Sequence, residues 1–302
     1  MDILSVTVHH YDAFCQEKNK GNPAGIVLNA DTLTVDQMQQ IAFEVGFNET
    51  AFALQSNKAD LRIRFFTPGH EMNLCGHATM AMISALLDKD SLNNKTMLNI
   101  ETAAGVLPIA LQSGPEGNGL IQMTQSSPLF TLFKGDKTEL AHAIGINKDD
   151  ICDDLPIVYG STGTWTLLVP IKSLAAFEVM QPNNKAFPSI LTEMPKASVH
   201  PFCLETYYTK PDMHARHFSS PYSGTIEDPV TGTASGVMGA YYAKFIVDQT
   251  VEPCYQLTIE QGQEIGKDGE VRVCVTGDLN QLQVSILGQA IHNKDLKIDL
   301  TE

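Results

Sequence analysis

The sequence predicts an α+β fold of two pseudo-symmetric halves, each a strongly curved, mostly antiparallel sheet around a central helix. One observation is the segment Ala78 to Leu87, in which only Thr79 and Ser84 are polar. A helix that is apolar on every side is buried on every side, and this segment is too short to cross a bilayer. The other observation is a similar apolar segment at Asp228–Val247, about half a chain further on.

The two segments also align with each other. The letters "CGHAT" at Cys75 match "TGTAS" at Thr231, and strands and a proline-containing turn precede both. We interpret this as an internal duplication, because self-similarity at a fixed spacing is typical of repeated structural units. The predicted halves are 1–122 and 123–282, and the C-terminal strand, 283–302, can join the N-terminal half.

The elements before the first apolar segment follow from periodicity. "ILSVTVHHYDAF" alternates and predicts a strand, and "GNPAGIVL" predicts a turn that leads into a second strand. A helix is expected after Thr34, since Thr34 and Gln37 fit a capping box, and Gly46 is expected to end it. "ETAFAL" and "DLRIRFF" predict two further strands.

Composition excludes several classes of partner. Acidic residues outnumber basic ones 35 to 20, for a net charge of −15, so binding to nucleic acid or to an anionic membrane is not expected. The start of the chain lacks the basic region of a signal peptide. The six cysteines are scattered and form no CxxC pair, which favours a reducing, cytoplasmic location.

Chemistry is expected at the starts of the two central helices. The first turn of a helix has unpaired amide groups and a partial positive charge, which suit a carboxylate or an enolate. Gly76 and Gly232 would let such an anion approach the backbone closely. If the two halves face each other, both helix starts would converge on one cleft.

Other kinds of site lack support in the sequence. The spacing of His70, Glu71, Cys75 and His77 matches no standard metal site, so no metal is predicted. There is no P-loop, no GxGxxG after a strand and no GxSxG, which argues against nucleotide binding and against an α/β-hydrolase.

Several motifs together resemble the PhzF-like family of phenazine-biosynthesis isomerases and their relatives. They are "GNPAG" at Gly21–Gly25, "NETAF" at Asn48–Phe52, "RIRFFTP" through "CGHAT", "EDPVTGTASG" and the closing "QGQEIGKDGEVRV". Within the family the chain is most similar to the uncharacterised YddE-type branch. The resemblance implies a diaminopimelate epimerase-like fold with the site between two halves, a homodimer, and neither a metal nor an organic cofactor.

The resemblance also implies roles for individual residues. Glu49 matches the catalytic acid/base, and His77 and Asp228 match the polar pair that assists it. Gly76, Gly232 and Thr233 match the positions that bind the substrate carboxylate. Thr233 replaces a Ser and Cys75 replaces an Ala of the phenazine-pathway members, which argues against the phenazine-pathway substrate itself.

Each of these residues also has a structural interpretation. Glu49 taken alone is typical of a solvated turn, His77 of a satisfied core histidine, and Asp228 of a helix cap. Cys75 has no thiol partner, because Thr231 occupies the equivalent position in the second half and a hydroxyl is too weak an acid to replace a thiol. A two-cysteine racemase is therefore disfavoured, and Cys75 is interpreted as a buried filler.

These inferences predict a cofactor-independent isomerase. It would move a proton and a double bond within a small, cyclic or conjugated anionic metabolite that bears a carboxylate, with Glu49 as the general acid/base. An amino-acid epimerase or racemase, and a non-catalytic small-anion binding protein, are the alternatives.

Overall fold

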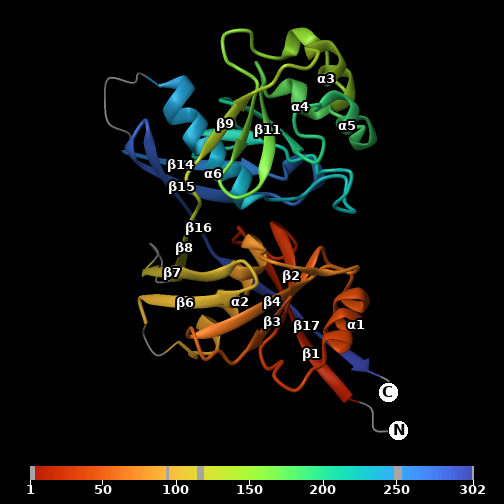
Figure 1. Cartoon of the computed structure of the whole chain (residues 1–302), viewed down its shortest axis with the longest axis vertical. Coiled ribbons are helices and arrows are strands. Elements are labelled where there is room, and N and C mark those ends of the chain that lie inside the picture. Colours follow the sequence, from red (N-terminus) through yellow and green to blue (C-terminus); the bar gives the residue numbers. More distant parts are fainter. Residues whose placement is uncertain (1–3, 93–94, 114–118, 248–253, 301–302) are drawn as a thin grey trace. The chain divides into compact units, whose positions relative to one another are not determined.

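The computed structural model describes residues 4–92, 95–113, 119–247 and 254–300. The chain divides into two compact units (Figure 1). The N-terminal unit comprises residues 1–123 and 287–302, and the C-terminal unit comprises residues 124–286.

The N-terminal unit is a sheet wrapped around one buried helix. Its elements are β1 (Leu4–Ala13), β2 (Asn22–Val27), α1 (Val35–Val45), β3 (Glu49–Leu54), β4 (Leu61–Phe66), β5 (Glu71–Met72), α2 (Gly76–Asp88), β6 (Met97–Thr102), β7 (Gly105–Ser113), β8 (Gly119–Thr124) and β17 (Ala290–Leu300). β17 pairs with β1 and β1 with β2, both antiparallel. β2 and β3 are parallel, β3 and β4 are antiparallel, β4 and β6 are parallel, and β6, β7 and β8 form an antiparallel meander.

The predicted first helix is confirmed at both ends. The Thr34 hydroxyl accepts a hydrogen bond from the Gln37 amide at 3.2 Å, and the Gln37 side chain accepts one from the Thr34 amide at 2.9 Å. Gly46 ends α1 in the left-handed conformation, with φ of 70°. Its apolar face is buried in a core cluster with Val8 and Phe52.

The predicted central helix of the N-terminal unit is also confirmed. Every residue from His77 to Ala85 in α2 is buried, and α2 contacts β1, β2, β3 and β17. Its two buried hydroxyl side chains have partners, because Thr79 donates to the Cys75 carbonyl at 2.7 Å and Ser84 accepts from the Ala290 amide at 2.9 Å. The helix is therefore fixed inside the sheet.

The C-terminal segment that the sequence predicts as one strand forms two strands in the structure. β16 ends at Gly288 and β17 begins at Ala290, and the intervening Gln289 carbonyl accepts from the Phe14 amide at 2.8 Å. β17 then pairs with β1 from Ala290 to Leu300. The first and last described strands of the chain are therefore neighbours.

The C-terminal unit has its own sheet and its own central helix. Its elements are β9 (Leu129–Leu132), α3 (Lys137–Ile144), β10 (Val158–Ser161), β11 (Trp165–Pro170), α4 (Ala175–Val179), α5 (Phe187–Ile190), β12 (Ser198–Cys203), β13 (Met213–Ala215), α6 (Gly232–Tyr241), β14 (Cys254–Gln261), β15 (Gly269–Asp278) and β16 (Gln281–Gly288). A π-helical turn at Tyr242–Ile246 follows α6.

The strand pairing of one unit repeats in the other. Four successive pairings are parallel, antiparallel, parallel and antiparallel in both units. In the N-terminal unit they are β2–β3, β3–β4, β4–β6 and β6–β7. In the C-terminal unit they are β11–β12, β12–β13, β13–β14 and β14–β15. The central helix lies at the same place in the chain order, since α2 follows β4 and β5 and α6 follows β13. The α+β class with a helix-filled, curved sheet in each half is confirmed, and the shared topology agrees with the predicted duplication.

The second central helix is packed closely against its sheet. Nine of the ten residues of α6 are buried, and the helix contacts β10 and β15. A β-carbon on Gly239 would lie 2.6 Å from Val273 Cγ1, whereas one on Gly236 would lie 3.3 Å from Ile286 Cγ2. Within the described ranges, no helix combines the length and the apolar character that a membrane span requires.

The packing of α6 yields a stability prediction. Replacing Gly239→Ala adds helix propensity worth about 1 kcal/mol but forces α6 away from Val273, and overpacking costs about 1–3 kcal/mol. We expect a net loss of stability, measured as a fall in Tm by differential scanning fluorimetry. Gly236→Ala is the matched control, with the same gain in propensity and a looser contact. A Tm of Gly239→Ala at or above that of Gly236→Ala would contradict the prediction.

Candidate active site

Three side chains of the N-terminal unit meet at the start of α2. Glu49 is the first residue of β3, Cys75 is the N-cap of α2, and His77 lies in its first turn. Glu49 Oε2 lies 3.2 Å from His77 Nε2, and Cys75 Sγ lies 3.5 Å from His77 Nδ1. The Glu49 side chain is 14% exposed, so it is not the solvated turn residue that its position after a helix suggests.

The Glu49 carboxylate is only partly paired. Its contact with His77 lacks the geometry of a hydrogen bond, so the buried Oε2 has no hydrogen-bond partner among the described residues. A buried polar atom without a partner carries an energetic cost, and such atoms are concentrated at functional sites. This oxygen is available to accept a proton.

The surroundings of His77 and Cys75 raise the pKa of both side chains. Burial disfavours the charged imidazole, but the Cys75 sulfur and the Glu49 carboxylate outweigh it and raise the pKa of His77 well above 6.5. Burial and the Glu49 charge raise the pKa of Cys75. The pKa of the thiol therefore lies above its usual value, and the Cys75 sulfur and the Glu49 carboxylate both favour the imidazolium form of His77.

The two central helices start without the caps that two peripheral helices have. Thr34 caps α1 and Asp136 caps α3 through side-chain hydrogen bonds, whereas neither Cys75 nor Thr231 makes a side-chain cap. The Ala78 amide faces the Cys75 sulfur, which is a weak acceptor. The first turns of α2 and α6 therefore have donors suited to an anion.

Gly76 is not required by packing inside the protein. A β-carbon at this position would meet nothing within 4 Å, and its φ does not lie in the left-handed region. The close approach of a ligand to the backbone at this position stays a prediction.

The Glu49, Cys75 and His77 ligand atoms lie within 4.8 Å of one another, close enough to share a metal ion. His70 and Glu71, the other two members of the cluster that the sequence analysis weighed as a metal site, have different partners. Glu71 pairs with Arg64 through two hydrogen bonds, and His70 bonds to Thr67.

The C-terminal unit has a second polar group at the start of α6. The Asp228 carboxylate accepts a hydrogen bond from the Thr231 hydroxyl at 2.5 Å, and the Asp228 amide donates to the His217 carbonyl at 2.9 Å. Gly232 is buried as the first residue of α6, and Thr233 is half-buried in its first turn.

Sequence reasoning missed the residue that fixes this group. Gln261 ends β14, and its amide group donates to the Asp228 carbonyl at 2.8 Å and to the Thr231 hydroxyl at 3.3 Å. Its oxygen accepts from the Thr231 amide at 3.2 Å. Gln261 belongs to the motif "QGQEIGKDGEVRV", but a lone Gln in a strand gives no signal of its own.

A buried ion pair holds the chain just before Asp228. Arg216 makes a two-pronged contact with Glu227, at 2.8 and 2.7 Å, and also donates to the carbonyls of Phe177 and Met180. Bidentate Arg–carboxylate pairs fix orientation as well as charge. The position of Asp228 is therefore fixed by the ion pair of the preceding residue, Glu227, and by the hydrogen bonds to Gln261 and Thr231.

The predicted site residues thus fall into two local groups. Glu49, Gly76 and His77 gather in the N-terminal unit, and Asp228, Gly232 and Thr233 gather in the C-terminal unit. Their catalytic and binding roles remain predictions.

Comparison with known proteins identifies close relatives. The chain is 51% identical to the uncharacterized isomerase YfhB of Bacillus subtilis over 284 residues, which cover 94% of this chain and 95% of the relative. It is 34% identical to the uncharacterized isomerase YddE of Escherichia coli K12 over 287 residues, covering 94% and 95%. It is 29% identical to the trans-2,3-dihydro-3-hydroxyanthranilate isomerase of Pseudomonas chlororaphis over 289 residues, covering 94% and 97%.

Solved structures agree on the fold. The phenazine biosynthesis protein of the PhzF family from Bacillus anthracis matches with a TM-score of 0.95 and 55% identity, covering 98% of this chain and 99% of that one. A hydroxyproline epimerase from Agrobacterium vitis matches with a TM-score of 0.64 and 13% identity, covering 99% and 93%, and shows the likeness to the epimerase fold. The family model described as "phenazine biosynthesis-like protein" matches residues 11–295. The chain therefore belongs to the phenazine biosynthesis-like, or PhzF, family of isomerases.

Proposed function

We propose that this protein is a cofactor-independent isomerase that moves a proton, and with it a double bond, in a small carboxylate-bearing metabolite. The observation that carries the proposal is the half-paired Glu49 carboxylate beside His77 at the uncapped, open start of α2. The Pseudomonas relative is named for a reaction on a cyclic carboxylate, which supports this substrate class.

Glu49 is the general acid/base in this proposal. Its carboxylate takes a proton from one carbon of the substrate, the electron pair left behind becomes delocalised, and the carboxylic acid returns the proton to another carbon. The reaction needs no oxidant and no net proton. A single carboxyl group can serve both steps because its deprotonated and protonated forms alternate within each cycle.

The delocalised anion needs stabilisation where its charge develops. The raised pKa keeps His77 protonated near neutral pH, so an imidazolium stands beside the base. The first-turn amides of α2, which no side chain covers at the half-buried Gly76, supply further donors. Donors that are already oriented stabilise a developing charge without reorganisation, which is the larger part of many enzymic rate accelerations. They also offset the unfavourable net charge of −15.

We also assign a binding role to the C-terminal group at the start of α6. The uncapped start of α6 at Gly232 and Thr233 would bind a carboxylate, and Asp228 would orient a polar substituent. Gln261 acts as a positioning residue in this proposal, since it holds both Asp228 and Thr231.

Replacing Glu49→Gln removes the base and keeps the shape, so it tests the proposal directly. We expect turnover to fall by at least about 10³-fold, near the upper range for the loss of a general base. The measurement is a mass-spectrometric screen of a metabolite extract and of trans-2,3-dihydro-3-hydroxyanthranilate in D₂O, scoring product and deuterium uptake.

Glu44→Gln is the matched control, because Glu44 is an exposed residue of α1. Undiminished turnover and exchange in Glu49→Gln would refute the assignment of the base. Deuterium uptake at the α-carbon of an amino acid would identify an epimerase or racemase instead, and tight ligand binding without turnover would identify a binding protein.

Replacing Asp228→Asn keeps the acceptor for the Thr231 hydroxyl but removes the charge. If Asp228 orients the substrate, we expect kcat/KM to fall by about 10²-fold while Tm stays within about 2 °C of wild type. Asp154→Asn, at an exposed position of the same unit, is the control. Equal kcat/KM in the two variants would contradict the role of Asp228.

The charge pairing of His77 predicts a titration shift. We expect the pKa of His77 to lie above 6.5 in the wild type and to fall in Glu49→Gln, because the carboxylate stabilises the imidazolium. Cys75→Ala should lower the pKa as well, because the Cys75 sulfur also favours the imidazolium form. NMR titration of the histidine ring signals measures both. An unchanged pKa of His77 in Glu49→Gln would contradict the pairing of the carboxylate with the imidazole.

A further inference from the structure

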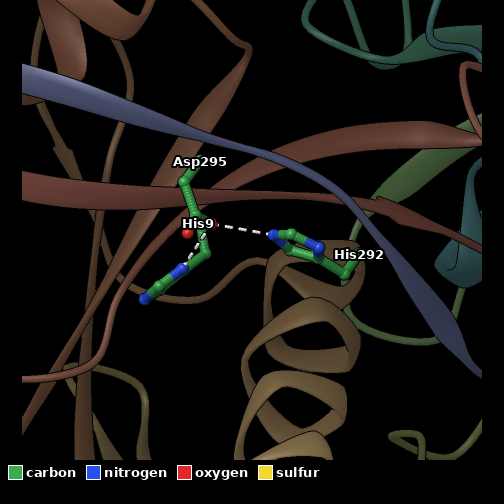
Figure 2. Close-up of side chains that lie close together, drawn as sticks. All are labelled: His9, His292 and Asp295. Atoms are coloured by element: carbon green, nitrogen blue, oxygen red, sulfur yellow. Dashed lines mark hydrogen bonds and ion pairs between the residues drawn. The ribbon is translucent and has the colours of Figure 1, made fainter.

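A second cluster of ionisable side chains lies in the N-terminal unit, away from the residues assigned to the reaction. His9 is on β1, and His292 and Asp295 are on β17 (Figure 2). His9 Nδ1 and His292 Nε2 lie 2.7 and 2.8 Å from the same oxygen, Asp295 Oδ1. Figure 2 shows the two imidazole rings approaching this carboxylate from different sides.

A β-bulge brings the third member onto the same face. His9 lies opposite Asp295 in the β1–β17 ladder, and side chains opposite each other point to one face of a sheet. His292 is three residues before Asp295, so in a regular strand it would point to the other face. The register shifts between His10 and Tyr11, so that Tyr11 lies opposite His292 and Asn293 is the extra residue. The bulge therefore places His292 beside His9.

The ring of His292 is held in place by a buried neighbour. Tyr11 packs against it edge to face, with ring centroids 5.3 Å apart, and the Tyr11 hydroxyl donates to Asp88 at 2.8 Å. A second carboxylate thus lies on the far side of Tyr11. Packing that fixes a histidine ring is typical of the support around metal ligands.

The three donor atoms suit a divalent transition metal. The nitrogens of His9 and His292 and a carboxylate oxygen of Asp295 all lie within 4.8 Å of one another, and two imidazoles with one carboxylate form a common three-ligand zinc set. Imidazole favours zinc, nickel and copper over calcium or magnesium. The side chains of His292 and Asp295 are 41% and 51% exposed, so an ion can enter and the ligands can spread around it.

We propose that His9, His292 and Asp295 form a zinc-binding site that links β1 and β17, the first and last described strands. The link joins residues 286 positions apart in sequence. These ligands come together only in the folded chain, so zinc binding stabilises the fold by mass action. The proposed site shares no residue with the group assigned to the reaction and does not depend on that reaction.

The test uses untagged, full-length protein that has been dialysed against a chelator. Isothermal titration with ZnCl₂ should show one ion bound per chain, and saturating zinc should raise Tm by about 5 °C. His292→Asn and Asp295→Asn should each weaken zinc binding at least tenfold and abolish the rise in Tm. His70→Asn, which removes an exposed histidine outside the cluster, should change neither result.

A spectroscopic measurement separates this cluster from the group of Glu49, Cys75 and His77, which also brings three potential ligands together. Co²⁺ bound at His9, His292 and Asp295 should give d–d bands without a thiolate charge-transfer band, and Cys75→Ser should retain zinc binding. Loss of binding in Cys75→Ser, unchanged binding in both His292→Asn and Asp295→Asn, or no binding by the wild type would each overturn the proposal. Circular dichroism of every variant confirms that the fold is intact.

Discussion

The starts of two buried helices, at which neither N-cap side chain makes a capping hydrogen bond, are the constraint around which this structure is organised. A helix inside a sheet buries its apolar sides favourably, but its first turn has donors that bulk water reaches poorly. α1 and α3, at the periphery of their units, solve this with Thr34 and Asp136 as caps. α2 and α6 have no such cap, and the polar residues assigned to chemistry gather at their starts.

The surrounding packing keeps these helix starts in place. In the N-terminal unit, α2 is fixed by apolar contacts on all sides and by the bond from the Ala290 amide to Ser84. In the C-terminal unit, Gln261 holds the turn before α6, and small residues such as Gly239 let the helix approach its sheet. Rigid elements position reacting groups better than loops do, because little ordering remains to be done when a substrate binds.

The pairing of Glu49 with His77 follows from this scaffold. β3 delivers a carboxylate and the first turn of α2 delivers an imidazole, and burial strengthens their interaction. A carboxylate next to an imidazole favours the imidazolium form of the histidine. Cys75, beside them, is kept as a neutral thiol by the same burial.

The sequence by itself determined the elements whose signal is local. Hydrophobic periodicity and capping residues predicted α1 and the first strands, and uniform apolarity predicted α2 and α6. The family motifs predicted the candidate site residues. Only the tertiary structure decided contacts between residues far apart in the chain, where local pattern carries no information. These include Gln261 against Asp228, and the bulge that joins His9 to His292 across the β1–β17 ladder. Register and side-chain direction depend on the strand that a residue meets, which periodicity does not specify.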